Sequence, residues 1–342
     1  MINEKELLAK LKMYSYEDNV KSYRSMAETM IPYLLSLYFI FTGPTLLIQL
    51  LAMMVFALMN VRFFTLFHDF AHGALFRAKT PGMKAMRVIM EIFGFSVLLT
   101  KEIWAEPHNR HHQYNSRLDE FFVGQIPVSS TAKFLKMTRF EKFYYLFFRL
   151  PFVIPFGYVI SCLLAVIIII QKPKPRVKIL AALAYHFTVL ALIYKFAGVQ
   201  TFVIYISGVV LGLAFIKYLF NLQHVFPGAH YYPKEEWSMV KASLHTTSFL
   251  RMSRLGHWIT ANIGYHHVHH MSPKIPFYNL PLAMEAIPEL QNPFTIGWHP
   301  RSVLGVLFGA AAWDQDNKTM ISFGKLYTTY RTHTKPIEAS NG

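Results

Sequence analysis

The sequence predicts an all-α integral membrane protein with four transmembrane helices arranged as two hairpins. Hydrophobic residues make up 53% of the 342-residue chain and aromatic residues 16%, a composition typical of membrane proteins. Four apolar segments are long enough to cross a bilayer, and three short histidine clusters lie outside them or at their ends. We therefore expect two membrane hairpins, interfacial or re-entrant helices between them, and a cytosolic cap that carries a histidine-rich metal site.

The apolar segments define the expected helices and domain boundaries. The hairpins are joined by residues 42–45 and 197–200, and each linker contains a glycine suited to a tight turn. We assign the four spans to residues 25–42, 45–67, 179–197 and 200–222. Segment 88–100 is too short to cross and 143–170 is broken by prolines, so both are expected at the interface. The chain then divides into a cytosolic N-terminal segment, a membrane domain and a C-terminal tail, at residues 1–24, 25–325 and 326–342.

The distribution of charge predicts which side of the membrane the clusters face. The chain carries 34 basic and 19 acidic side chains, a formal net charge of +15. Basic residues are concentrated after the first two clusters and before the second hairpin, whereas the hairpin tips together contain only Lys195. Because basic loops stay cytoplasmic, all three clusters are expected on that side. The charge flanks membrane segments, so anionic lipid headgroups or an acidic soluble partner explain it better than a nucleic-acid groove.

The spacing of the histidine clusters predicts metal binding. Residues three and four apart are neighbours on a helix, so each cluster places its imidazoles on one face. Eight such imidazoles are more than one ion takes, which predicts a pair of ions. Iron, copper, zinc and nickel all accept imidazole, so the spacing alone leaves the metal open. The clusters are His68-x-x-x-His72, His108-x-x-His111-His112 and His266-His267-x-His269-His270.

Residues around the clusters exclude two common metal sites. Asp69 stands where an HExxH zinc protease needs its glutamate, and no glutamate precedes a histidine by three residues, as carboxylate di-iron bundles require. A dinuclear site with histidine ligands alone is therefore expected, with His267 off the shared face as a non-ligand. Asp69 and Asn262 are candidates to orient imidazoles through the second ring nitrogen, and ordinary capping or packing roles are equally open to them. Asp119 and Glu120 are weaker candidates.

Taken in order, the HxxxH, HxxHH and HxxHH motifs resemble the three histidine boxes of the membrane fatty acid desaturases. Segment Asn221–His224 is similar to the additional histidine site of that family, and stretch Trp258–Leu280 resembles the bacterial acyl-lipid (phospholipid) desaturases. The similarity runs over about residues 30–325. His224 joins the ligand set through this resemblance alone. The resemblance implies two iron ions, with O2 as co-substrate, held by His68, His72, His108, His111, His112, His224, His266, His269 and His270.

The resemblance also implies a function and partners. The implied function is that of an oxygen-dependent desaturase, which introduces a cis double bond into acyl chains of membrane lipids. Its active site would lie on the cytoplasmic side of a bacterial inner membrane. An external electron donor is required, and ferredoxin or flavodoxin fits the basic face, with cytochrome b5 as the alternative. Acyl-CoA and acyl carrier protein substrates stay open. The alternative functions are a hydroxylase, ketolase or alkane mono-oxygenase on the same scaffold and, more distantly, a metal transporter or metal-sensing membrane protein.

Overall fold

The first hairpin consists of α2 (Asn19–Thr42) and α3 (Leu46–His72), which pack side by side. The structure is a computed structural model and describes residues 3–118, 128–171 and 176–334. The Asp18 carboxylate accepts the first free N–H groups of α2, so this helix begins at Asn19 and not at residue 25. The helix α3 continues to Gly73, whose φ of 70° ends it, and so extends past residue 67 through the first histidine cluster. A short helix, α1 (Glu4–Lys12), precedes the hairpin.

The second hairpin is formed by α9 (Arg176–His224), which consists of two helical arms that meet at Gly198. Gly198 has φ 80° and ψ 170°, a conformation outside the helical region that a glycine adopts without a Cβ clash. The rings of Tyr194 and Phe202, on either side of the bend, lie 5.7 Å apart, so the chain folds back at this point. The second arm packs closely on α3, since a Cβ at Gly212 would lie 2.9 Å from the Ala57 carbonyl oxygen.

The described residues contain two helices, α3 and α9, that are long and apolar enough to cross a membrane. The helix α2 is 24 residues long, but Lys21, Arg24 and Glu28 stand in its first half and lower its apolar character. The predicted spans at 25–42 and 45–67 and the predicted pair in α9 therefore all coincide with helices. The count of four crossings stays a prediction.

The segments between the hairpins form shorter helices. The helix α4 (Pro81–Ser96) buries Met83, Met90 and Phe93 on one face and exposes apolar residues on the other, as an interfacial helix does. It begins well before residue 88, because Thr80 caps it. The predicted 143–170 segment is divided at its prolines. The pieces that follow α4 are α5 (Lys101–Tyr114), α6 (Thr131–Lys136), α7 (Arg139–Phe147), the 3-10 turn η1 (Pro151–Phe156) and α8 (Gly157–Gln171). The 15 residues of α8 rise about 22 Å, less than the hydrocarbon thickness of about 30 Å.

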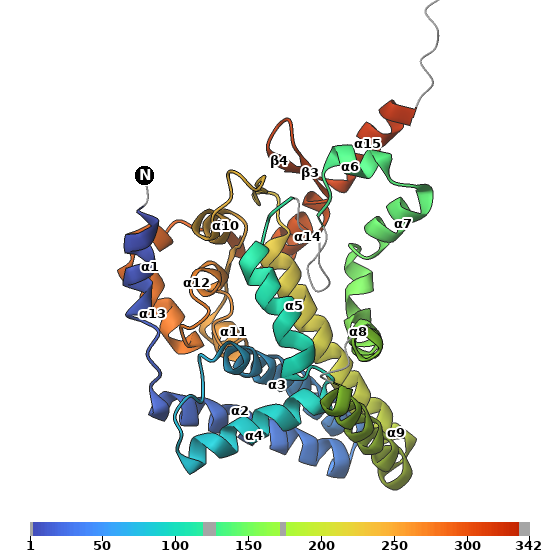
Figure 1. Cartoon of the computed structure of the whole chain (residues 1–342). Helices are drawn as coiled ribbons and strands as arrows, with labels where there is room; N and C mark the ends of the chain where they lie inside the picture. The colour runs from blue at the N-terminus through green and yellow to red at the C-terminus, as the bar shows by residue number, and fades with distance from the viewer. Residues whose placement is uncertain (1–2, 119–127, 172–175, 335–342) are drawn as a thin grey trace, which may run out of the picture.

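The cap is built from short helices and four short strands after α9. Figure 1 shows α10 to α13 gathered beside α1 and α5, at the opposite end from the bend of α9. The strands pair as β1 with β2, parallel, and β3 with β4, antiparallel, so the mostly helical chain also contains two small sheets that the sequence analysis did not predict. Each strand has three residues, too few to show an alternating pattern in the sequence. The elements are α10 (Met239–His245), β1 (Phe249–Arg251), α11 (Arg254–Ile259), α12 (His266–Met271), η2 (Phe277–Asn279), α13 (Leu280–Ala286), η3 (Pro288–Leu290), β2 (Thr295–Gly297), α14 (Pro300–Gly309), β3 (Ala312–Asp314), β4 (Thr319–Ile321) and α15 (Phe323–Thr334).

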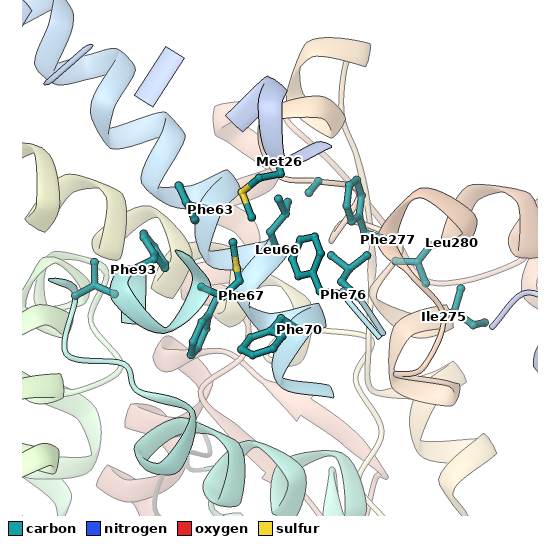
Figure 2. Close-up of a cluster of buried hydrophobic side chains, with 14 of the residues drawn as sticks. Met26, Phe63, Leu66, Phe67, Phe70, Phe76, Phe93, Ile275, Phe277 and Leu280 are labelled. Atoms are coloured by element: carbon teal, nitrogen blue, oxygen red, sulfur yellow. The ribbon is translucent and has the colours of Figure 1, made fainter. Parts of the chain in front are cut away.

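One hydrophobic core joins the membrane helices to the cap. Figure 2 shows Phe63, Leu66 and Phe67 of α3 beside Met26 and Phe93, with Phe277 and Leu280 of the cap nearby. Arg62 of α3 is a buried cation beside this core, and its partners come from two elements, α2 and α11. The Arg62 guanidinium donates to the Glu28 carboxylate (3.2 Å) and to Thr29 Oγ1 (3.0 Å), both on α2, and to the Trp258 carbonyl of α11. These contacts fix the position of α11 relative to the first hairpin.

Candidate metal centre

All nine histidines of the predicted ligand set lie on helices that converge at one place. The first pair is in the last two turns of α3, and the second cluster occupies the C-terminal half of α5. His224 ends the second arm of α9, and α12 consists largely of the third cluster. The helix geometry predicted from the spacing therefore holds in each cluster. Eight of the nine side chains are buried, and His72 is half-buried.

The structure divides the nine imidazoles into two groups, which we call the five-imidazole group and the four-imidazole group. Within each group the candidate ligand nitrogens lie within 4.8 Å of one another. The second and third clusters both contribute to both groups, so neither group belongs to one stretch of sequence. The five-imidazole group is His68, His72, His108, His112 and His269; the four-imidazole group is His111, His224, His266 and His270.

The nitrogens within each group face each other at short distances. In the four-imidazole group, His224 Nε2 lies 2.7 Å from His266 Nε2 and 3.0 Å from His111 Nε2. In the five-imidazole group, His108 Nε2 lies 3.1 Å from His68 Nε2 and 3.0 Å from His112 Nε2. Two imidazoles bound to one ion at about 2.1 Å would have their nitrogens about 3.0–3.4 Å apart. Facing lone pairs repel each other, so a cation at each group would relieve this repulsion; three of the four distances fall in the expected range, and the 2.7 Å between His224 and His266 is shorter.

Burial keeps these imidazoles in the form that binds metal. Desolvation lowers the pKa of His111 to about 3. Desolvation also lowers the pKa of His112, with a further contribution from neighbouring imidazoles, His270 foremost. The pKa values of His266 and His269 are lowered for the same reasons. A metal ligand must be neutral imidazole, and at neutral pH these side chains are neutral without first releasing a proton.

Comparison with known proteins identifies the family. The family model for fatty acid desaturases matches residues 43–302, a range that contains all nine histidines. The chain belongs to the fatty acid desaturase family. It is 28% identical over 329 residues to a fatty acid desaturase of Bacillus subtilis (strain 168), covering 94% of this chain and 91% of that protein. It is 26% identical over 330 residues to the chloroplastic omega-6 fatty acid desaturase of Brassica napus, covering 90% of this chain and 69% of that protein.

A third relative is named for a different class of lipid, the sphingolipids. The sphingolipid delta(4)-desaturase DES1 of Drosophila melanogaster is 27% identical over 217 residues, covering 63% of this chain and 58% of that protein. The family and the two histidine groups together indicate iron binding by this desaturase. The two candidate spanning helices, α3 and α9, fit the membrane protein expected from composition.

The residues proposed to support the ligands behave differently from one another. Asp69 Oδ1 lies 3.2 Å from His68 Nδ1, and Asp69 Oδ2 accepts the N–H of Phe277 (2.8 Å), so Asp69 lies where an orienting partner is expected. Within the described part of the chain, the Asn262 side chain makes no hydrogen bond to a ligand histidine. Its Nδ2 donates to the Phe277 carbonyl (3.2 Å) in a turn where its φ is 53°, which is the packing role. His267 donates its Nε2 proton to the Leu290 carbonyl (3.1 Å) and belongs to neither group. Asp119 and Glu120 lie outside the described residues.

Trp104 is a site residue that the sequence analysis missed. Its indole stacks on the His108 ring, with centroids 3.9 Å apart and planes 23° apart, and also contacts the His68 ring at 5.1 Å. Trp104 stands four residues before His108 on α5, so helical spacing could have placed the two side chains together. The stack holds the His108 imidazole in one orientation.

An apolar cavity of about 200 Å³ opens onto the centre of the desaturase. Its walls come from α3, α5, α8 and the second arm of α9. The residues that line it include His68 and His108 of the five-imidazole group and His266 of the four-imidazole group. An extended hydrocarbon chain in this cavity would therefore reach both groups. The apolar lining includes Phe64, Ile103, Trp104, Leu213 and Phe220.

Proposed function

We propose that this desaturase is an oxygen-dependent acyl-lipid desaturase, which introduces a cis double bond into the acyl chains of membrane lipids with a di-iron centre. The observation that carries the proposal is the apolar cavity, whose lining includes histidines of both imidazole groups. Unactivated methylene groups have no affinity for polar sites, so an apolar cavity beside metal ligands suits a hydrocarbon substrate. The Bacillus and Brassica relatives, named as fatty acid desaturases, support the same reaction class.

The residues present fit two iron ions. Eight of the nine imidazoles, all but His72, have Nε2 within 3.2 Å of the Nε2 of another histidine in the same group, and burial keeps the imidazoles neutral. Bound iron supplies the oxygen-dependent removal of hydrogen from an unactivated carbon chain, which acidic and basic side chains do not perform. The ions would be held by His68, His72, His108, His112 and His269 in one group and His111, His224, His266 and His270 in the other.

The chain's own residues position the ligands and the substrate. With its proton on Nδ1, His68 donates a hydrogen bond to the Asp69 carboxylate, and its Nε2 keeps a lone pair for the five-imidazole group. The Trp104 indole fixes the His108 ring and forms part of the cavity wall. The apolar walls exclude water and hold an acyl chain in place beside the histidines. These contacts supply placement, and the metals supply the chemistry.

The rival oxygenases on this scaffold differ in their product. A hydroxylase, ketolase or alkane mono-oxygenase would leave oxygen on the carbon chain, whereas a desaturase leaves an alkene. The three relatives described above are all named desaturases, which favours desaturation here. Metal transport is disfavoured, because both groups of imidazoles gather at helix ends beside a hydrocarbon-like cavity.

The proposal includes a location and an electron donor. Basic segments flank the histidine clusters and the hairpin tips carry one lysine, which supports a centre on the cytoplasmic side of a bacterial inner membrane. An acidic soluble donor suits such a basic face. We propose ferredoxin or flavodoxin, with cytochrome b5 as the alternative.

Product analysis tests the function. The chain is expressed in a host that lacks unsaturated fatty acids, and the double-bond positions and lipid classes of the products are determined by mass spectrometry. We expect a new cis double bond in phospholipid acyl chains in aerated cultures and none without oxygen. A hydroxylated product with no alkene would contradict desaturation, and an alkene confined to acyl-CoA would contradict the acyl-lipid substrate.

A further inference from the structure

A lysine lines the apolar cavity beside the metal centre. Lys217 lies on the second arm of α9, and its stem packs against the start of α8, since a Cβ on Gly157 would lie 3.7 Å from Lys217 Cβ and Cγ. Among the described residues, the cavity lining contains no carboxylate, and Lys217 Nζ has neither a hydrogen bond nor an ion pair. A cation among apolar side chains is unfavourable until an anion joins it. The missing partner is therefore expected from the ligand.

The helical rise places Lys217 at the level of a lipid headgroup. Gly198 marks the bend of the hairpin, and a rise of 1.5 Å per residue puts Lys217 about 28 Å from it. That distance is close to the hydrocarbon thickness of a bilayer, about 30 Å. His224 lies about 10 Å further along the same arm. With the bend at one surface of a bilayer, Lys217 would lie near the opposite surface and the metal ligands just beyond it.

We propose that Lys217 binds the phosphate of a glycerophospholipid whose acyl chain occupies the cavity. This inference rests on the proposed function and adds the residue that recognises the lipid headgroup. The phosphate lies beside Lys217 at the membrane surface, and the acyl chain runs along the apolar walls to His68, His108 and His266. A lysine that merely extended its stem along apolar surface would give no preference between lipids with and without a phosphate.

Lipid binding to the metal-free protein tests this assignment without reference to activity. Purified protein is mixed with dipalmitoyl phosphatidylglycerol, dipalmitoylglycerol or palmitate, and the bound lipid is measured by native mass spectrometry. The wild type should bind phosphatidylglycerol at least about tenfold more tightly than dipalmitoylglycerol, the ratio expected of a charged hydrogen bond. Lys217→Met should bring the ratio close to one, and Lys217→Arg should keep most of it. Lys195→Met is the matched control, because Lys195 is exposed near the bend of the same hairpin.

Each contrary result overturns the assignment. Equal binding of phosphatidylglycerol and dipalmitoylglycerol by the wild type does so without any variant, so a misfolded Lys217→Met protein cannot obscure the answer. Tighter binding of palmitate than of phosphatidylglycerol would show that Lys217 binds a free carboxylate and not a lipid phosphate. A Lys217→Met protein that keeps the preference, or a Lys195→Met protein that loses it, also refutes the proposal. A wild type that shows the preference but forms no alkene when loaded with iron counts against the proposed function alone.

Discussion

Two neighbouring histidines on α12 offer a sharp test of the metal centre. His269 and His267 are both fully buried, but they point to different partners. His269 Nε2 lies 3.2 Å from His112 Nε2 in the five-imidazole group, whereas His267 Nε2 donates to the Leu290 carbonyl. Replacing either with alanine removes the same atoms from the same helix. Only the relation to the metal differs.

The two substitutions should have opposite effects on iron content and stability. Loss of a residue that only supports a metal ligand weakens metal affinity by about 10–100-fold. His269→Ala removes a ligand itself, so we expect metal affinity to fall by at least this factor and activity to fall below about 1% of the wild type. His267→Ala leaves the Leu290 carbonyl without its donor, at about 1–3 kcal/mol of unfolding free energy. It should keep its iron and most of its activity.

Iron is measured by plasma mass spectrometry on purified protein, stability by thermal unfolding, and activity by alkene formation in the host. His269→Ala protein with wild-type iron and activity would refute the two-group arrangement. His267→Ala protein that loses iron while remaining folded would refute the exclusion of His267 from the ligands.

Three further outcomes follow from the structure. Asp69→Asn leaves one oxygen to accept hydrogen bonds from both His68 Nδ1 and the Phe277 N–H, so metal affinity should fall about 10–100-fold. Competition with a chelator measures the affinity, and an unchanged value would show that Asp69 does not orient His68. Arg62→Met should lower the free energy of unfolding by about 3 kcal/mol, because Arg62 is buried. Arg24→Met removes the exposed partner of the same Glu28 carboxylate and should lower it by less than about 0.5 kcal/mol. Equal losses of unfolding free energy in chemical denaturation would contradict this account. The metal-free protein should lose stability as the pH falls below about 6.5, the pKa of histidine in an unfolded chain. Burial lowers the pKa of His111 to about 3 and of His267 to about 4 in the folded protein, so below about pH 6.5 the unfolded chain binds more protons than the folded one. Unfolding temperatures that stay constant from pH 7 to pH 5 would refute this prediction.

The parts of the site that the sequence predicted are those set by local geometry. The three- and four-residue spacings determine which imidazoles share a helix face, and each cluster does lie on a helix. The division into groups of five and four depends on how α3, α5, α9 and α12 come together, and no local sequence pattern determines that packing. His111 and His112 are adjacent in the chain, yet they belong to different groups.

The fold shows the same division between local and long-range information. The hairpin helices were predicted because their apolar runs are long, although capping by Asp18 and the left-handed Gly73 moved their ends. The strands of the cap were missed, since three residues are too short for a pattern. Asn262 was a candidate because of its position before the third cluster, and its turn conformation shows the alternative, packing role.

Because the adjacent residues His111 and His112 belong to different groups, the orientation of α5 affects both groups at once. Neighbouring residues on a helix point about 100° apart, so any rotation of α5 that improves the approach of His111 to its group turns His112 relative to the other. An ion held by His111 and its group would fix the angle of α5, and the same angle would set the direction of His112 towards the other group. Loading should be cooperative, with an iron titration that rises steeply from empty to full and contains few half-filled molecules.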